Sequence, residues 1–261
     1  MSGPTLFGLG ALLSAVLMAA VFLLALRIRN FSVVDIAWSA VFAPLALLDA
    51  ALAGGHGPRR VLIAAMVTLW SVRLAWHLGV RIAALHPEEE GRYVQLRKQW
   101  ASNPNARFFW FFQAQGVLAA LLSVPFLLAS LDGRAALGPF ELAGAALFVV
   151  ALAGEAVADR QLAAFKARPD SRGRTCREGL WRYSRHPNYF FEWLVWVAFA
   201  VFSWPSPLGW IAIACPLFML YLLLRVTGIP ATEEQALRSR GDDYREYQRT
   251  TSAFFPWPPR R

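Results

Sequence analysis

The sequence has few charged side chains for its length, and this scarcity decides its class. Only 16% of the 261 residues are charged and 57% are hydrophobic, whereas about a quarter of the residues in an ordinary globular domain are charged. A soluble chain of this size could not keep so much apolar surface away from water. The composition therefore excludes an ordinary soluble protein and predicts an integral membrane protein.

Cysteine is also scarce, and the charges are unbalanced. Cys176 lies in a basic segment and Cys215 in an apolar one, so we expect free thiols rather than a disulfide framework. The net charge is +9, but the basic residues lie between apolar runs rather than in one basic domain. This distribution argues against a nucleic-acid partner and favours membrane orientation and anionic lipid or phosphate ligands.

Seven apolar runs are candidates for membrane spans, each of which needs about 20 residues. They cover residues 4–26, 31–53, 61–82, 108–131, 138–157, 189–204 and 208–227. The sixth run is short and would extend into its flanks or tilt among its neighbours. We therefore predict an all-α, polytopic membrane protein with seven transmembrane helices and one domain over residues 1–261.

The loop charges predict how the chain is oriented. With the N-terminus outside, the inner segments hold 22 of the 26 Lys and Arg residues and the outer segments hold three. Because positive residues concentrate on the cytoplasmic side of membranes, we expect the N-terminus outside and the C-terminus in the cytoplasm. Three inner segments are long, and functional residues are expected in them: 83–107, 158–188 and 228–261.

The stretch from residue 179 to 192 carries the most chemistry. It reads Gly-Leu-Trp-Arg-Tyr-Ser-Arg-His-Pro-Asn-Tyr-Phe-Phe-Glu and leads into the sixth apolar run. Arg185, His186 and Asn188 would lie just before a helix N-terminus, which itself favours an anion. Glu192 shares the helical face of Asn188, where an acid is costly unless it faces a polar cavity. The alternative is a basic belt that only contacts anionic lipid headgroups.

With Trp196 one turn further on, this stretch resembles the steroid 5-alpha-reductase-like family of integral membrane reductases, especially its bacterial branch. The segment from Glu155 to Lys166 adds to a likeness that covers most of the chain. The resemblance implies an NADPH-dependent reductase of an activated carbon–carbon double bond in a lipid, such as a 3-oxo-4-ene steroid, and a place in a bacterial inner membrane. No Gly-x-Gly-x-x-Gly fingerprint is present, so a Rossmann domain is not expected to bind the cofactor.

The resemblance also assigns residues to a cofactor half that covers about residues 138–261. It implies that three residues contact the adenosine and phosphate end of NADPH, where cations suit phosphates: Asp159, Lys166 and Arg174. It places three others near the nicotinamide: Asn188, Glu192 and Trp196. The remaining candidate cofactor contacts are Tyr183, Arg185, His186, Arg225, Glu234 and Tyr247.

The C-terminal segment is expected to close this cofactor pocket. It predicts a helix that ends at Gly241 and a second short helical turn with Tyr244 and Tyr247. Similar tails in membrane reductases fold back over the cofactor. The alternative is an amphipathic helix that lies on the membrane surface.

Ionisable residues inside the apolar runs are candidates for catalysis, because an unpaired charge in mid-membrane costs about 2.5–3.5 kcal/mol. Steroid reductases use an acid on the second span and a tyrosine on the third. Asp35 matches the acid, but Trp70 stands where the tyrosine is expected, and an indole cannot protonate an enolate. Two other residues could reach the inner mouth of the cavity and donate the proton: His77 in the third run and Tyr93 in the inner segment 83–107. The catalytic candidates are Asp35, His77 and Tyr93. In the alternative interpretation, Asp35 only forms a structural ion pair with Arg73.

Two other functions stay open. Arg185-His186-Pro187, the Glu233-Glu234 pair and the tyrosines Tyr244 and Tyr247 also resemble the isoprenylcysteine carboxyl methyltransferase type, which uses S-adenosylmethionine. A non-catalytic lipid-binding protein would explain the buried charges without a cofactor. The expected partners are a lipid or steroid-like substrate and membrane lipids; no metal site is predicted, and the oligomeric state is not predicted.

Overall fold

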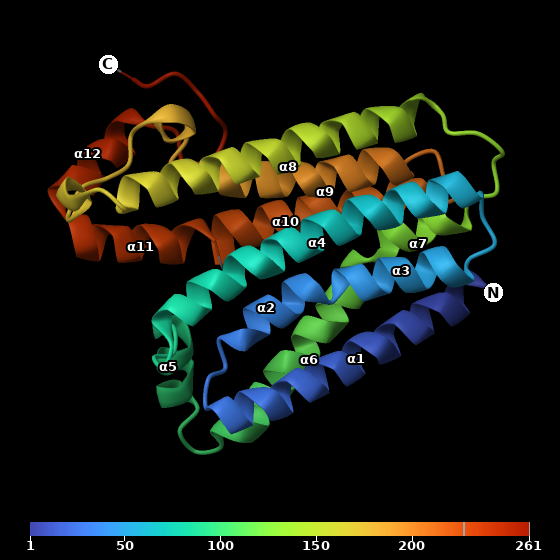
Figure 1. Ribbon diagram of the computed structural model, residues 1–261, viewed down its shortest axis with the longest axis horizontal. Helices are drawn as coiled ribbons and strands as arrows, with labels where there is room; N and C mark the ends of the chain where they lie inside the picture. The colour runs from blue at the N-terminus through green and yellow to red at the C-terminus, as the bar shows by residue number, and fades with distance from the viewer. Residues whose placement is uncertain (227, 261) are drawn as a thin grey trace. The chain divides into compact units, whose positions relative to one another are not determined.

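The computed structural model describes residues 1–226 and 228–260, and within them the chain is helical and forms no strand (Figure 1). Six helical segments are long and apolar enough to cross a membrane, which indicates a multi-pass membrane protein. They are Gly3–Ile28, Val33–Leu52, Gly57–Leu85, Pro104–Leu131, Pro139–Lys166 and Gly209–Arg240. The predicted all-α membrane fold is thus confirmed.

The predicted number of seven spans is not confirmed. The sixth apolar run forms α9 (Pro187–Ser203), which has 17 residues and is shorter than the six spanning segments. The seventh run was expected to end at Thr227, which lies outside the described residues. Its described part is helical through η3 (Gly209–Ile213), α10 (Ala214–Tyr221) and η4 (Leu222–Val226).

The helices gather into two compact units. Unit 1 contains Met1–Gly138 and the short segment Pro205–Gly209, and unit 2 contains Pro139–Trp204 and the chain from Trp210 onward. The sequence predicts one domain whose cofactor half starts at about residue 138. The structure places a boundary between compact units at that residue.

Unit 1 contains seven helices: α1 (Gly3–Ile28), α2 (Val33–Ala40), α3 (Phe42–Leu52), α4 (Gly57–Leu85), α5 (Gly91–Gln99), α6 (Pro104–Leu122) and α7 (Val124–Leu131). α1 packs on α6, and α4 packs on α2 and α3. Gly116 permits the close approach of α6 to α1, since its carbonyl accepts a hydrogen bond from the Ser14 hydroxyl at 2.9 Å and a Cβ would lie 3.1 Å from Met18. Small residues serve membrane helix pairs in this way.

A break between α2 and α3 sets the direction of α2. Pro44 has no N–H to donate to the carbonyl four residues earlier, so helical bonds are lost there. Ser71 of α4 replaces them: its hydroxyl donates to the Ser39 carbonyl at 2.6 Å and accepts from the Ala43 N–H at 3.2 Å. The backbone therefore stays hydrogen-bonded at membrane depth, and α2 presents Asp35 at its start.

Unit 2 begins with α8 (Pro139–Lys166), which packs along α9, and α9 in turn packs on α10 (Figure 1). α8 and α9 are antiparallel: Gly144 near the start of α8 faces Phe202 near the end of α9, and Gly154 faces Phe191. A Cβ on Gly144 would lie 2.7 Å from the Phe202 nitrogen. The end of α8 and the start of α9 therefore lie at the same end of unit 2.

The C-terminal part of unit 2 follows the sequence prediction. α11 (Ile229–Arg240) ends at Gly241, whose φ of 56° and ψ of −122° suit glycine alone, and α12 (Asp242–Thr250) follows at once. Between α8 and α9 the chain forms two short 3-10 turns, η1 (Pro169–Ser171) and η2 (Gly179–Arg182).

Candidate functional site

In unit 1 the structure brings two of the predicted catalytic residues together. The Tyr93 hydroxyl donates a hydrogen bond to Asp35 Oδ1 at 2.7 Å, and Arg92 Nη2 lies 2.8 Å from the same oxygen. Arg92 also donates to the Tyr93 hydroxyl. We call these three residues the triad. The expected alternative paired Asp35 with Arg73, whereas the structure pairs Asp35 with Arg92.

The segment before α5 carries Tyr93 to this place. Glu89 accepts a hydrogen bond from the Phe31 N–H at 2.6 Å and forms an ion pair with Arg97 at 3.1 Å. The Arg97 guanidinium also lies over the Phe31 ring, 4.8 Å from its centroid. These contacts dock α5 against the turn between α1 and α2, so a tyrosine far along the chain reaches the acid of α2.

The surroundings keep the Tyr93 phenol protonated. Its side chain is fully buried, and burial raises the pKa of Tyr93 well above its ordinary value, with the negative charge of Asp35 raising it further. The phenol is therefore a hydrogen-bond donor at neutral pH. The triad reaches the protein surface, because the Asp35 side chain is 24% exposed and that of Arg92 is 43% exposed.

Three other polar or aromatic residues of unit 1 lie outside the triad: Trp70, His77 and Trp38. Trp70 is fully buried, with its ring centroid 5.3 Å from that of Phe42, so it belongs to the core. His77 is half-buried on α4 and lies outside the triad. Trp38 lies one turn from Asp35 on α2, and its buried indole N–H makes no hydrogen bond with any described residue. It is a spare donor on the helix that carries the acid.

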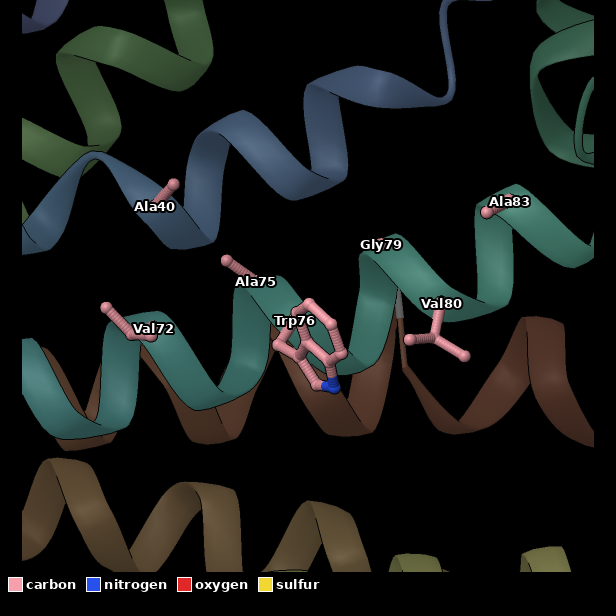
Figure 2. A pocket seen from close by; sticks show the side chains of 7 residues that line it. All are labelled: Ala40, Val72, Ala75, Trp76, Gly79, Val80 and Ala83. Atoms are coloured by element: carbon pink, nitrogen blue, oxygen red, sulfur yellow. The ribbon is translucent and has the colours of Figure 1, made fainter.

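An apolar groove of about 470 Å³ runs along α4 (Figure 2). Its floor consists of small residues four apart, Ala75, Gly79 and Ala83, and a Cβ on Gly79 would lie 4.0 Å from Ile36 of α2. The other lining residues are larger or come from α2: Val72, Trp76, Val80 and Ala40. The groove thus lies beside the helix that carries Asp35, and its lining suits a hydrocarbon.

In unit 2 a cluster of polar residues forms around Glu233 of α11. Its Oε1 lies 2.6 Å from Arg185 Nε, 3.3 Å from His186 Nε2 and 3.4 Å from the Tyr244 hydroxyl, while Oε2 accepts from Gln248 Nε2 at 2.9 Å. We call this cluster the latch, because it joins the start of α9 to α11 and α12. Burial lowers the pKa of His186 although Glu233 opposes the shift, so this imidazole is neutral at pH 7.

Further bonds tie the end of the chain to the 179–192 stretch. Arg185 Nη1 donates to the carbonyls of Gln248 at 3.0 Å and Thr251 at 2.6 Å. The Tyr247 hydroxyl contacts the Trp181 carbonyl and donates to that of Ser184 at 3.1 Å. Two predicted cofactor contacts, Arg185 and Tyr247, therefore use their polar groups to hold the C-terminal helices.

Glu234, the acid that the sequence assigned to the cofactor, is exposed and pairs with Arg238 on its own helix. Its neighbour Glu233 occupies the position in the latch. The sequence spacing indicates that Glu233 rather than Glu234 faces inward. Ile229, Glu233 and Ala236 lie on one face of the helix, and Ile229 and Ala236 are buried.

The remaining predicted cofactor residues form two pairs and an exposed group. Asn188 Nδ2 lies 3.4 Å from Asp159 Oδ1, and Glu192 accepts from Trp196 Nε1 at 3.1 Å. Both pairs involve the first three turns of α9. The exposed group consists of Lys166, Arg174, Tyr183 and Arg225, of which Arg174 forms a surface ion pair with Asp170 at 3.0 Å.

These features define a multi-pass, all-helical membrane protein with polar clusters beside its spans. Residues 21–251 match the family described as "Protein of unknown function (DUF1295)", and the chain belongs to that family, which includes steroid 5-alpha-reductase-like membrane proteins. Over an alignment of 278 residues, the chain is 28% identical to the uncharacterized protein C594.04c of Schizosaccharomyces pombe (strain 972). The alignment covers 96% of this chain and 79% of that protein. No solved structure matches the chain.

Proposed function

We propose that the protein is an NADPH-dependent reductase of an activated carbon–carbon double bond in a lipid, with enones such as 3-oxo-4-ene steroids as the substrate class. The observation that carries this proposal is the 2.7 Å hydrogen bond between Tyr93 and Asp35 beside Arg92. When a hydride adds to the β-carbon of an enone, negative charge develops on the carbonyl oxygen. A hydrogen-bond donor fixed at that oxygen stabilises the transition state.

Each member of the triad has a role in this proposal. Before the substrate binds, Asp35 orients the phenol by accepting its O–H. When the enone binds, the Tyr93 O–H is proposed to turn from Asp35 to the enone oxygen, because a phenol has one proton to donate, and the guanidinium of Arg92 offsets the developing negative charge. The unbonded N–H of Trp38 supplies a second donor on the same helix. The tyrosine that is missing from the third span at Trp70 is thus replaced by one from α5, and the apolar groove on α4 is proposed to hold the hydrocarbon part of the substrate.

Unit 2 is proposed to bind the cofactor, which supplies the hydride when bound. Two exposed cations, Lys166 at the end of α8 and Arg174 after it, fit its phosphates. The Asn188–Asp159 pair can exchange hydrogen bonds with an amide. We assign Arg185, His186 and Tyr247 to the positioning of α11 and α12 instead, because the latch and the tail occupy their polar atoms.

Seven spans, an external N-terminus and a cytoplasmic C-terminus in a bacterial inner membrane are part of the proposal. At about 1.5 Å per residue, α9 is about 25 Å long, a few ångströms short of a hydrocarbon core of about 30 Å. Its packing along α8 allows a short crossing that neighbours shield. The 22-to-3 bias of loop cations supports the proposed orientation. Reporter fusions at both ends test this, and activity on one common side would overturn it.

The experiment that tests the proposed activity is single-turnover oxidation of NADPH by the purified protein with a panel of lipid enones. Tyr93→Phe should slow hydride transfer by about 100-fold, in line with the loss of an acid or oxyanion donor. Tyr221→Phe, at an exposed tyrosine of α10, is the matched control and should leave the rate unchanged. Equal rates for wild type and Tyr93→Phe would remove the triad from the reaction.

A second candidate is an S-adenosylmethionine-dependent methyltransferase. The observation in its favour is the latch, which gathers Arg185, His186, Glu233 and Tyr244, the residues of the shared motif. Mass spectrometry of the nucleotide that copurifies with the gently solubilised protein separates the two candidates. NADPH supports the reductase, S-adenosylmethionine supports the methyltransferase, and a protein that binds neither would fit a non-catalytic lipid-binding role.

A further inference from the structure

After α12 the chain folds back as an ordered tail along the start of α9. The Arg185 N–H donates to the Ser252 carbonyl at 2.8 Å, the Trp257 N–H to the Tyr183 carbonyl at 2.9 Å, and the Arg260 N–H to the Thr250 carbonyl at 2.8 Å. Three backbone bonds thus fix the tail from residue 250 to residue 260. Its side chains have defined places, so the surface that it builds can select a ligand.

The tail encloses a polar pocket of about 270 Å³. Three arginines line it, Arg185, Arg249 and Arg260, together with the hydroxyl residues Thr250, Thr251 and Ser252, and no lining residue is acidic. Glu233 offsets the charge of Arg185. Arg249 and Arg260 are exposed and form no ion pair within residues 1–226 and 228–260. The pocket therefore has an excess positive charge and hydrogen-bond donors, which suits a phosphate group.

Aromatic residues place this pocket at the level where a membrane begins. Phe254 and Phe255 of the tail pack on Phe190 and Trp193 in the first two turns of α9, with ring centroids 5.8 to 6.1 Å apart. Phe255 is 53% exposed and Trp257 is 69% exposed. Exposed aromatic rings at the end of an apolar helix are typical of the membrane–water interface. The arginines line the same pocket as Trp257, as headgroup-binding cations do beside interfacial aromatic residues.

We propose that this pocket binds the phosphate of an anionic phospholipid headgroup, with Phe255 and Trp257 contacting the glycerol and upper acyl region of the same lipid. The phosphate explains why Arg249 and Arg260 line the pocket without an ion pair among the described residues. The lipid, rather than a free phosphate, explains why large rings stay exposed beside them. Arg249 and Arg260 are outside the proposed cofactor site, so the lipid site and the reductase proposal stand or fall separately.

Native mass spectrometry of the full-length protein in detergent tests the site. Phosphatidylglycerol and phosphatidylcholine are added in equal amounts to the wild type and to Arg249→Ala/Arg260→Ala. Arg238→Ala/Arg245→Ala is the charge-matched control, because these exposed arginines of α11 and α12 lie in local pairs with Glu234 and Asp242. We expect the wild type and the control to retain phosphatidylglycerol at least tenfold better than phosphatidylcholine, and the pocket variant to lose most of this preference.

Two further arms identify the source of the phosphate. Trp257→Ala should weaken lipid retention several-fold while the preference for an anionic headgroup persists, and glycerol phosphate at millimolar concentration should compete poorly. Melting temperatures check that the variants fold, and NADPH affinity, measured in parallel, should be unchanged. The proposal is overturned if the pocket variant keeps the preference, if the control loses it equally, or if glycerol phosphate competes as well as the lipid.

Discussion

The triad of unit 1 and the latch of unit 2 each contain a single carboxylate, but the two carboxylates differ in how many hydrogen bonds they accept. Glu233 accepts from four side chains, Arg185, His186, Tyr244 and Gln248, and both of its oxygens are engaged. Asp35 accepts from two side chains through Oδ1 alone. A carboxylate offers about four acceptor sites. Glu233, whose acceptor sites are occupied, therefore holds helices together. Asp35 has unused acceptor sites and can respond to a ligand.

The contacts that hold each cluster in place fit this division. Glu233 joins three separate segments of unit 2, and removal of the acid would leave an inward-facing guanidinium without its partner. The triad is docked by other residues, Glu89 and Arg97, so its own polar atoms are not needed to hold α5. Stability should thus depend on Glu233, and turnover should depend on Asp35. The following predictions test this contrast.

The largest effect is expected for Glu233→Ala. The change removes the charge partner of Arg185, whose side chain is only 11% exposed. Loss of one partner of a fully buried ion pair costs about 3–5 kcal/mol, which is the upper bound for this largely buried pair. The free energy of unfolding in mild detergent should fall by up to this amount. Glu234→Ala is the matched control, because an exposed i,i+4 pair contributes about 0.5 kcal/mol or less. Similar losses in both variants would mean that the latch is not a stabilising cluster.

Asp35→Asn should have the opposite profile. Asparagine keeps the shape and still accepts the Tyr93 hydrogen bond, but it loses the charge that orients the phenol, so hydride transfer should fall by about 100-fold. The free energy of unfolding should change by less than about 1 kcal/mol. Rapid-mixing measurement of NADPH oxidation and a melting curve on the same sample check both halves. A normal rate would exclude Asp35 from catalysis and direct attention to His77.

The sequence predicted the spans and the second half of the chain better than it predicted the site. Apolar runs fix helices because the membrane leaves few other structures possible, and Gly241 marks the end of α11 by its φ requirement. The meeting of Asp35 and Tyr93 could not be predicted, because the contacts that dock α5 join Glu89 to Phe31 and Arg97 across a polar loop. Such contacts depend on tertiary geometry that no local pattern encodes.

For locating the residues of a polar site, the pattern of charged residues was less informative than their position around a helix. The exposed ion pairs of Arg174 with Asp170 and of Glu234 with Arg238 occupy residues that motif resemblance had assigned to the cofactor. In contrast, the spacing from Ile229 to Glu233 indicates which acid of the Glu-Glu pair faces inward. A resemblance names the residue types of a site, whereas burial decides which neighbour in a pair performs the role.

Acid should weaken the latch. The pKa of His186 is lowered from its ordinary value of 6.5 by burial, so the unfolded chain binds a proton before the folded protein does. Stability is therefore fully present above about pH 6.5 and is lost as the pH falls towards the folded pKa, by at most about 1.4 kcal/mol per pH unit. Melting curves between pH 7.5 and 5 check this slope. His186→Gln, which cannot titrate, should flatten it, and an unchanged slope would place the titrating group elsewhere.

The smallest effect is expected at Arg174, and it bears on the cofactor half alone. Arg174 is exposed and forms an ion pair with Asp170. Breaking that pair costs free energy, which reduces the net free energy that Arg174 can contribute by contacting a phosphate. Arg174→Ala should weaken NADPH by about tenfold, or roughly 1.4 kcal/mol, and leave NADH unchanged, because only NADPH carries the 2'-phosphate that a guanidinium can bind with two hydrogen bonds. Calorimetric titration of both nucleotides measures the difference, and Arg245→Ala controls for the lost charge. Equal weakening of NADPH and NADH would place Arg174 at the pyrophosphate, and no weakening of either would remove it from the cofactor site.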